Sequence, residues 1–169
     1  MRDMHNADLC DTLGNLVHRA TNLCNKFCGG AIPDVPAPTT SPINMTEICD
    51  SYIDKMNNFE LQGGANIAIQ GFRDVNRYLA EEAPWLKKGD EHAEARQIVV
   101  RASLEAIYAL AHLLLPFTPT GAKKIFEKVG KEPTSLSSLG RECRNLEVGT
   151  KVQVGQVLYE KVRNIIVVL

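Results

Sequence analysis

The sequence predicts an all-α protein, an antiparallel bundle of about five helices followed by an irregular, partly extended C-terminal tail. Apolar residues recur at three- and four-residue steps in five separate stretches, as expected of helices that bury one face. Prolines and glycines separate these stretches and predict where the helices end. We expect the bundle to occupy residues 1–135. The C-terminal tail, residues 136–169, is expected to pack on the bundle or on a partner.

The first expected helix, residues 6–27, has one apolar face and one polar face. On the polar face, Asn15 and Arg19 are four residues apart, so their side chains project from one patch. Gly29 and Gly30 are expected to end the helix because glycine tolerates positive φ. Periodicity alone favours a core helix with a solvated polar face, and the alternative is that this face is a recognition surface. The apolar face carries Leu9, Leu13, Leu16, Val17, Ala20, Leu23 and Phe27.

Two more helices are expected in the first half of the chain. A proline-rich loop, residues 31–44, forbids a regular helix and leads to the second helix, residues 44–59. The Gln-Gly-Gly sequence at residues 62–64 is expected to break the chain before the third helix, residues 65–82.

The third helix is expected to end in a turn that presents a tryptophan. Pro84 disfavours helical geometry at Ala83, so Trp85 should follow on a loop. Trp85 is the only tryptophan in the chain. Such a residue is most often a plug at the edge of the core, and the alternative is a partly exposed platform on which a nucleobase stacks.

The fourth expected helix, residues 92–115, is apolar around much of its circumference, which is typical of a central helix. Its longest apolar run, residues 106–117, is too short to span a bilayer, so no membrane insertion is expected. Arg101 and Glu105 can pair one turn apart. His112 is expected to be a hydrogen-bonded core or rim histidine rather than a catalytic one.

The fifth expected helix covers residues 121–130, and the pattern after it becomes irregular. Residues 150–159 alternate loosely and are expected to form a strand or an extended segment lying on the bundle. The last five residues, 165–169, are all apolar and require cover from the bundle or from a partner. In the fifth helix we expect Ile125, Phe126 and Val129 to point inward and Lys123, Lys124 and Lys128 to point outward.

The charge distribution limits the kinds of partner. Residues 1–85 carry 6 Lys/Arg and 11 Asp/Glu, a net −5, and residues 86–169 carry 13 and 9, a net +4, which together give −1. A nucleic-acid contact would therefore depend on a few placed groups rather than on a strongly basic field. Five cysteines without framework spacing, and no expected signal peptide, indicate a reducing compartment, which we take to be the cytoplasm.

No motif of a catalytic, phosphate-binding or metal-binding site is apparent in the sequence. It contains no glycine-rich phosphate loop, no metal-ligand cluster and no nucleophile–base pairing that is compatible with the expected helices. We therefore expect no catalytic residue, no metal ion and no cofactor, and interpret the chain as a binding or structural module.

Three motifs give a specific resemblance. They are NADLxxxLGNLVxR (residues 6–19), NRYLAEEAPW (residues 76–85) and LLLPFTP (residues 113–119). In this order and with these gaps they resemble the anticodon-binding domain of methionyl-tRNA synthetases, over nearly all of residues 6–160. The resemblance implies a helix bundle that follows a catalytic domain and reads the CAU anticodon of tRNA.

The resemblance also implies roles for five residues. Asn15 and Arg19 fall on positions that contact anticodon bases, and Pro84 and Trp85 fall on the turn whose tryptophan stacks on the first anticodon base. Asp11 occupies a position that is asparagine in bacterial members. An amide and a guanidinium can bind base edges while an indole holds an unstacked base, so the implied roles are physically consistent.

Two functions remain open at this point. The first is recognition of the tRNA(Met) anticodon as part of a methionyl-tRNA synthetase, whose ATP-dependent ligation this chain alone is not expected to perform. The alternative is a free-standing, synthetase-derived structural or interaction subunit that no longer reads tRNA and that could act in an organelle. In either case the C-terminal tail could dock on a catalytic domain or a larger complex.

Overall fold

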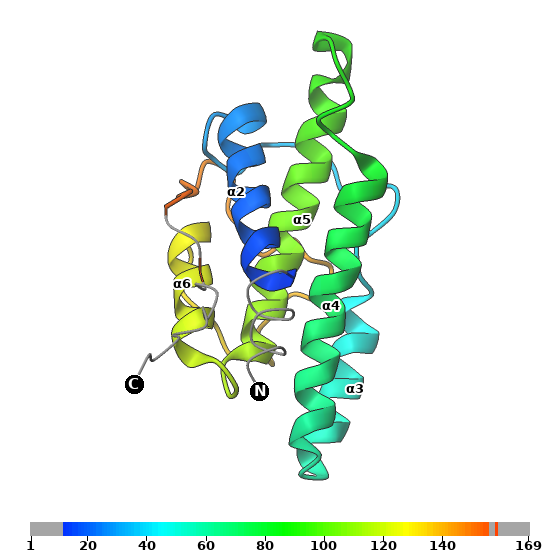
Figure 1. Cartoon of the computed structure of the whole chain (residues 1–169), viewed down its shortest axis with the longest axis vertical. Helices are drawn as coiled ribbons and strands as arrows, with labels where there is room; N and C mark the ends of the chain where they lie inside the picture. Colours follow the sequence, from blue (N-terminus) through cyan, green and yellow to red (C-terminus); the bar gives the residue numbers. More distant parts are fainter. Residues whose placement is uncertain (1–11, 156–157, 159–169) are drawn as a thin grey trace, which may run out of the picture.

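The computed structural model describes residues 12–155 and residue 158, and in this part of the chain five α-helices form a bundle (Figure 1). Successive helices run in alternating directions, so the expected all-α antiparallel bundle is confirmed. A short 3-10 helix, η2 (Asp90–His92), precedes the fourth α-helix. The α-helices are α2 (Asn15–Cys28), α3 (Met45–Asn57), α4 (Leu61–Glu82), α5 (Ala93–Leu114) and α6 (Pro119–Val129).

Helix α5 is the centre of the bundle. It contacts α2, α3, α4 and α6, and every residue from Val99 to Leu114 is buried. Among the described residues, Asp90–Leu114 is the one helical segment that is long and apolar enough to cross a membrane. Because 89% of its most apolar window is buried inside the bundle, these properties are those of a core helix.

The expected break at residues 62–64 is wrong. Helix α4 already begins at Leu61, so these residues lie in its first turn. The chain reverses earlier, at Phe59, whose φ of 58° places it in the left-handed region. The N–H of Glu60 then donates to the carbonyl oxygen of Lys55 at 2.9 Å and closes the connection between α3 and α4.

The glycines of α4 instead allow neighbouring side chains to approach its backbone. A Cβ on Gly64 would lie 2.8 Å from the sulfur of Met56 on α3, and one on Gly71 would lie 2.4 Å from Cδ2 of Leu110 on α5. Both distances are shorter than van der Waals contact allows. Small residues at these positions therefore set how closely α4 packs against α3 and α5.

The two ends of α2 are held by other parts of the chain. Residues 12–14 form a π-helical turn that leads into α2, and the expected residues 6–11 lie outside the described part. At the other end, Gly29 adopts a φ of 62°, as expected, and its N–H donates to Cys24. Directly beyond, Ala31 forms an isolated antiparallel bridge with Lys151.

The described part of the C-terminal tail lies on the bundle. The N–H of Ile32 donates to the oxygen of Thr150 at 3.0 Å, and the N–H of Val152 donates to the oxygen of Gly30 at 2.9 Å. The expected extended segment is thus present, and its backbone pairs over a short stretch with residues 30–32, which directly follow α2. Residues 159–169, including the apolar run 165–169, lie outside the described part, and the division of the chain at residue 135 stays a prediction. The apolar residues of this region that join the core are Leu139, Cys143, Leu146, Val152 and Leu158.

A buried ion pair on α5 anchors this region. The carboxylate of Glu105 is fully buried and accepts the N–H groups of Asn145 at 2.5 Å and Leu146 at 3.0 Å. Arg101 lies 3.6 Å from that carboxylate and donates to the oxygens of Pro33 at 2.7 Å and Leu146 at 3.3 Å. Burial raises the pKa of Glu105, while the two N–H groups and Arg101 oppose this shift. The expected i,i+4 pair exists, and it also fastens two loops to α5.

The outward orientation expected for Lys128 is wrong. Lys128 is only 8% exposed, because the C-terminal tail covers this face of α6. Its ammonium donates to the oxygen of Val154, and the N–H of Gln153 donates to the oxygen of Lys128 at 2.7 Å. Burial, with a smaller effect of Lys124, lowers the pKa of Lys128.

His112 is a core histidine, as expected. Its Nδ1 lies 2.9 Å from the oxygen of Tyr108, and its Nε2 accepts the N–H of Thr134 at 3.1 Å. Its ring also meets the ring of Phe126 edge-on, with 4.8 Å between centroids. Both hydrogen bonds require the neutral ring with its proton on Nδ1. Burial lowers the pKa of His112 accordingly.

Replacing Glu105 with alanine is expected to reduce the free energy of unfolding by about 3–5 kcal/mol, because Arg101 would stay buried without its counter-charge. Glu105→Gln should cost less, since its amide oxygen can still accept an N–H. Urea unfolding at neutral pH measures both. Glu142→Ala removes an exposed carboxylate three residues before Asn145 in the sequence and serves as the control. Equal costs for Glu105→Ala and Glu142→Ala would contradict the anchoring role.

His112 should make the fold sensitive to mild acid. Its folded pKa lies below the unfolded value of about 6.5, so its stabilising contribution is present above that pH and is lost as the pH falls. The loss approaches about 1.4 kcal/mol per pH unit while only the unfolded state binds the proton. Urea unfolding of the wild type between about pH 8 and pH 5.5 should show this slope, and His112→Gln should flatten it. A slope in His112→Gln equal to that of the wild type would contradict this role of His112.

Candidate nucleic-acid interface

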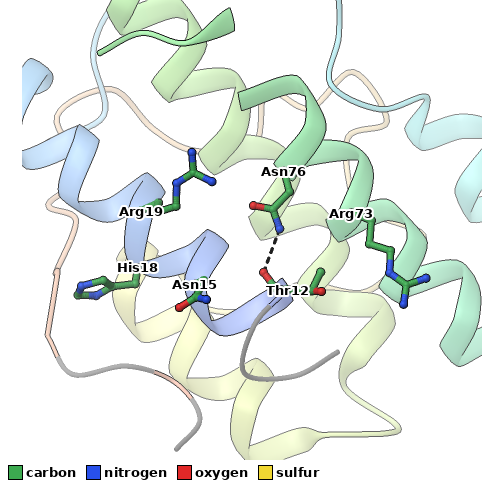
Figure 2. Close-up of a pocket in the computed structure, with 6 residues that line it drawn as sticks. All are labelled: Thr12, Asn15, His18, Arg19, Arg73 and Asn76. Carbon is green, nitrogen blue, oxygen red and sulfur yellow. Dashed lines mark hydrogen bonds between the residues drawn. The ribbon is translucent and has the colours of Figure 1, made fainter. Parts of the chain in front are cut away.

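The polar face of α2 and the adjoining face of α4 form an open cavity of about 450 Å³, here called the first cavity (Figure 2). Its lining includes two guanidinium groups and one imidazole and, among the described residues, no carboxylate. Such a surface suits a partner that is rich in hydrogen-bond acceptors and negative charge. The side chains that line it are Thr12, Asn15, His18, Arg19, Arg73 and Asn76.

A hydrogen bond between the two helices fixes the geometry of the first cavity. The side-chain amide of Asn76 on α4 donates to the oxygen of Thr12 at 3.0 Å, shown by the dashed line in Figure 2. Asn15, the first residue of α2, follows three residues after Thr12. The bond therefore sets where the start of α2, and with it Asn15, lies against α4.

The turn that carries Trp85 follows directly after α4. Ala83 adopts a φ of 39° and a ψ of 59°, which ends the helix in the left-handed region. This conformation costs about 1–2 kcal/mol in an L-residue, so the surrounding structure has to enforce it. Pro84 is buried, and the N–H of Leu86 donates to the oxygen of Ala83 at 2.9 Å. Trp85 is left 37% exposed.

The loop after Trp85 is held by charged side chains. One guanidinium nitrogen of Arg96, on α5, donates to the oxygens of Lys87 and Gly89, both at 2.7 Å. The ammonium of Lys87 lies 2.7 Å from the carboxylate of Glu82, the last residue of α4. These bonds tie the loop that directly follows Trp85 to both neighbouring helices.

A cation–π contact joins the two halves of this surface. The Cζ atom of Arg19 lies 5.2 Å from the ring centroid of Trp85. Arg19 also lines the first cavity together with Asn15. The structure thus brings Asn15, Arg19 and Trp85 to one surface, with Pro84 buried beneath the turn. Asp11 lies outside the described residues, and binding by any of the five stays a prediction.

Sequence reasoning did not include four residues of the first cavity: Thr12, His18, Arg73 and Asn76. A signal was present for Asn76, a polar residue that interrupts the apolar side of α4 and is half-buried. Arg73 precedes it by three residues and so lies on the same face of the helix. What the sequence could not supply is the fact that this face of α4 adjoins the polar face of α2.

No metal site is found among the described residues, where no three His, Cys, Asp or Glu side chains come together. The surface can act through hydrogen bonds, charge and stacking. Amides and guanidinium groups can bind base edges and phosphates, and the indole offers a flat apolar ring.

Sequence comparison relates this chain to one enzyme family. The family model described as the anticodon binding domain of methionyl tRNA ligase matches residues 36–165. The methionine–tRNA ligase of Thermotoga maritima is 27% identical over 161 residues, and that of Deinococcus radiodurans is 29% identical over 168 residues. These matches cover 93% and 92% of this chain but only 26% and 24% of the two relatives. The chain therefore spans about a quarter of the length of these curated relatives.

Solved structures share the fold. The apo form of Mycobacterium tuberculosis methionyl-tRNA synthetase superposes with a TM-score of 0.80 at 22% identity, over 95% of this chain and 34% of that chain. The same enzyme bound by methionyl-adenylate gives a TM-score of 0.78 at 23% identity, over 94% of this chain and 32% of that chain. The motifs, the helix bundle and the matched family model agree, and this chain belongs to the family of anticodon-binding domains of methionyl-tRNA ligase.

Proposed function

We propose that this domain binds the anticodon loop of tRNA(Met) and reads its CAU anticodon. The observation that carries the proposal is the contact of Arg19 with the exposed ring of Trp85, at the edge of the first cavity. A stacking ring, a guanidinium and several amides lie within one surface, which is the combination that single-stranded RNA recognition uses.

The proposed division of roles follows from the chemistry of each group. Trp85 stacks on the first anticodon base, and its rigid turn keeps the ordering cost of binding low. Asn15 has an amide that can both donate to and accept from a base edge, and Arg19 offers paired N–H donors. With a net charge of −1, the domain adds little general attraction to phosphates, so affinity should be modest and strongly dependent on these contacts.

The proposal extends to the protein of which this domain forms part. The chain spans about a quarter of its curated relatives, so the domain would serve a methionine–tRNA ligase whose catalytic domain lies elsewhere. Contact with that catalytic domain, or with a larger complex, would use the C-terminal tail, whose residues 165–169 are apolar. The site of action would be the cytoplasm. Nothing in the comparisons favours the free-standing structural subunit.

Trp85→Ala should weaken binding of a CAU anticodon stem-loop by about 1–3 kcal/mol, or about 5- to 150-fold, because one base loses its stacking partner. Fluorescence anisotropy of a labelled stem-loop at low salt measures this change. Leu86→Ala is the matched control, because Leu86 is the next residue and is 69% exposed. Equal losses in the two variants would mean that the loop, and not the indole ring, determines binding.

Arg19→Ala should mainly remove discrimination between the CAU loop and a loop with its first anticodon base changed. Its guanidinium adjoins both Trp85 and the first cavity, where base edges would lie. Titration of both loops with wild type and variant gives the two affinity ratios. Arg77→Ala, which removes an exposed guanidinium paired with Asp74, should keep the wild-type ratio. Weak and equal binding of both loops by all three proteins would contradict anticodon reading.

A further inference from the structure

A second open cavity of about 440 Å³ lies along α4 next to the first. Arg73 lines both cavities, so the two are adjacent at this residue. Trp85 follows the end of α4, so the second cavity extends the surface away from Trp85, toward the start of the helix. The residues that line the second cavity are Asn66, Ile67, Ile69, Gln70 and Arg73.

The second cavity has the chemistry of a nucleotide site. Ile67 and Ile69 are half-buried and supply apolar surface, while Asn66 and Gln70 are exposed amides. A nucleobase can pack its ring against apolar side chains and offer its edge to hydrogen-bonding groups. The volume is also within the range of about 300–1,000 Å³ that is typical of small-molecule sites.

Arg73 is well placed to bind a group that links two nucleotides. Figure 2 shows its side chain at the end of the first cavity opposite His18, pointing away from Arg19. Arg73 is an exposed residue. Consecutive bases of a single strand are joined by a phosphate, and an arginine can bind a phosphate through two parallel N–H groups. A guanidinium shared by two neighbouring cavities matches this repeat of base, phosphate and base.

The same helix supplies a control of equal charge. Arg77 comes one turn after Arg73, but its guanidinium lies 2.8 Å from Asp74 and it lines a different cavity, shared with α3 and the loop before it. Gln70 also donates to Asp74, at 3.0 Å. Replacing either arginine with glutamine changes the net charge of the domain equally, but of the two only Arg73 lines the second cavity.

We propose that Arg73 binds a backbone phosphate of the anticodon loop and that the second cavity receives a nucleotide flanking the anticodon. This inference rests on the proposed function and extends it from the three anticodon bases to their neighbour in the loop. A phosphate contact here adds affinity without sequence selectivity, whereas the base-edge contacts proposed for Asn15 and Arg19 supply the selectivity.

The first test compares Arg73→Gln with Arg77→Gln. Affinity for the CAU stem-loop, and for a loop with its first anticodon base changed, is measured between low and physiological salt. Arg73→Gln should bind both loops several-fold more weakly with an unchanged ratio between them. It should also lower the slope of log affinity against log salt by about 0.7, the value for one phosphate of a single strand. Arg77→Gln should match the wild type, and Arg73→Lys should recover the slope because it keeps the charge.

The second test locates the flanking nucleotide. Stem-loops that lack the base directly before or directly after the anticodon are titrated with wild type and with Asn66→Ala, which alters an exposed residue of the second cavity. One of the two abasic loops should bind the wild type more weakly than the intact loop. The difference should shrink in Asn66→Ala, because that variant has already lost part of the contact.

The outcomes separate this inference from the proposed function. A wild type that discriminates between anticodons, with an unchanged salt slope in Arg73→Gln or an equal change in Arg77→Gln, overturns the phosphate contact and leaves anticodon reading intact. Equal binding of both abasic loops and the intact loop overturns the assignment of the second cavity. A wild type that does not discriminate between anticodons overturns the proposed function itself.

Discussion

The buried pair of Arg101 and Glu105 is the constraint on which the rest of the arrangement depends. Two charges removed from water need hydrogen-bond partners, and here most of these partners are backbone groups of distant segments, while Nε of Arg101 has only the carboxylate of Glu105 at 3.6 Å. Most other residues of the buried stretch from Val99 to Leu114 are apolar, and apolar contacts are not directional. The pair marks one position on α5 to which both the loop after α2 and the C-terminal tail are hydrogen-bonded.

That meeting point affects the candidate nucleic-acid interface through α2. The C-terminal tail pairs with the backbone at the exit of α2, and Asn76 of α4 bonds to Thr12 at its entrance. With both ends held, the polar face of α2 has a defined position relative to the turn that carries Trp85. That turn is held locally, by the buried Pro84 and by the hydrogen bonds of Arg96 to the loop. The surface is therefore assembled from rigid elements rather than from mobile loops.

The sequence was sufficient where the cause of a structure is local. The period of α5, the positive φ of Gly29 and the turn at Pro84 all follow from a few neighbouring residues. It was misleading where the cause lies in another element: Gly64 marks a close approach of α3 and not a break, and Lys128 is covered by the C-terminal tail. Polar patches on two helices can each be recognised from periodicity. That both patches line one cavity depends on how the helices pack, which periodicity does not show.

The contact between Arg19 and Trp85 means that the unliganded ring is not bare. A base stacking on the covered face has to exchange places with the guanidinium, and the gain is then the difference between two ring contacts. The displaced guanidinium is released next to the incoming base, where it can turn to a base edge or a phosphate. Under the proposed function, stacking on that face would exchange the partners of both the ring and the guanidinium.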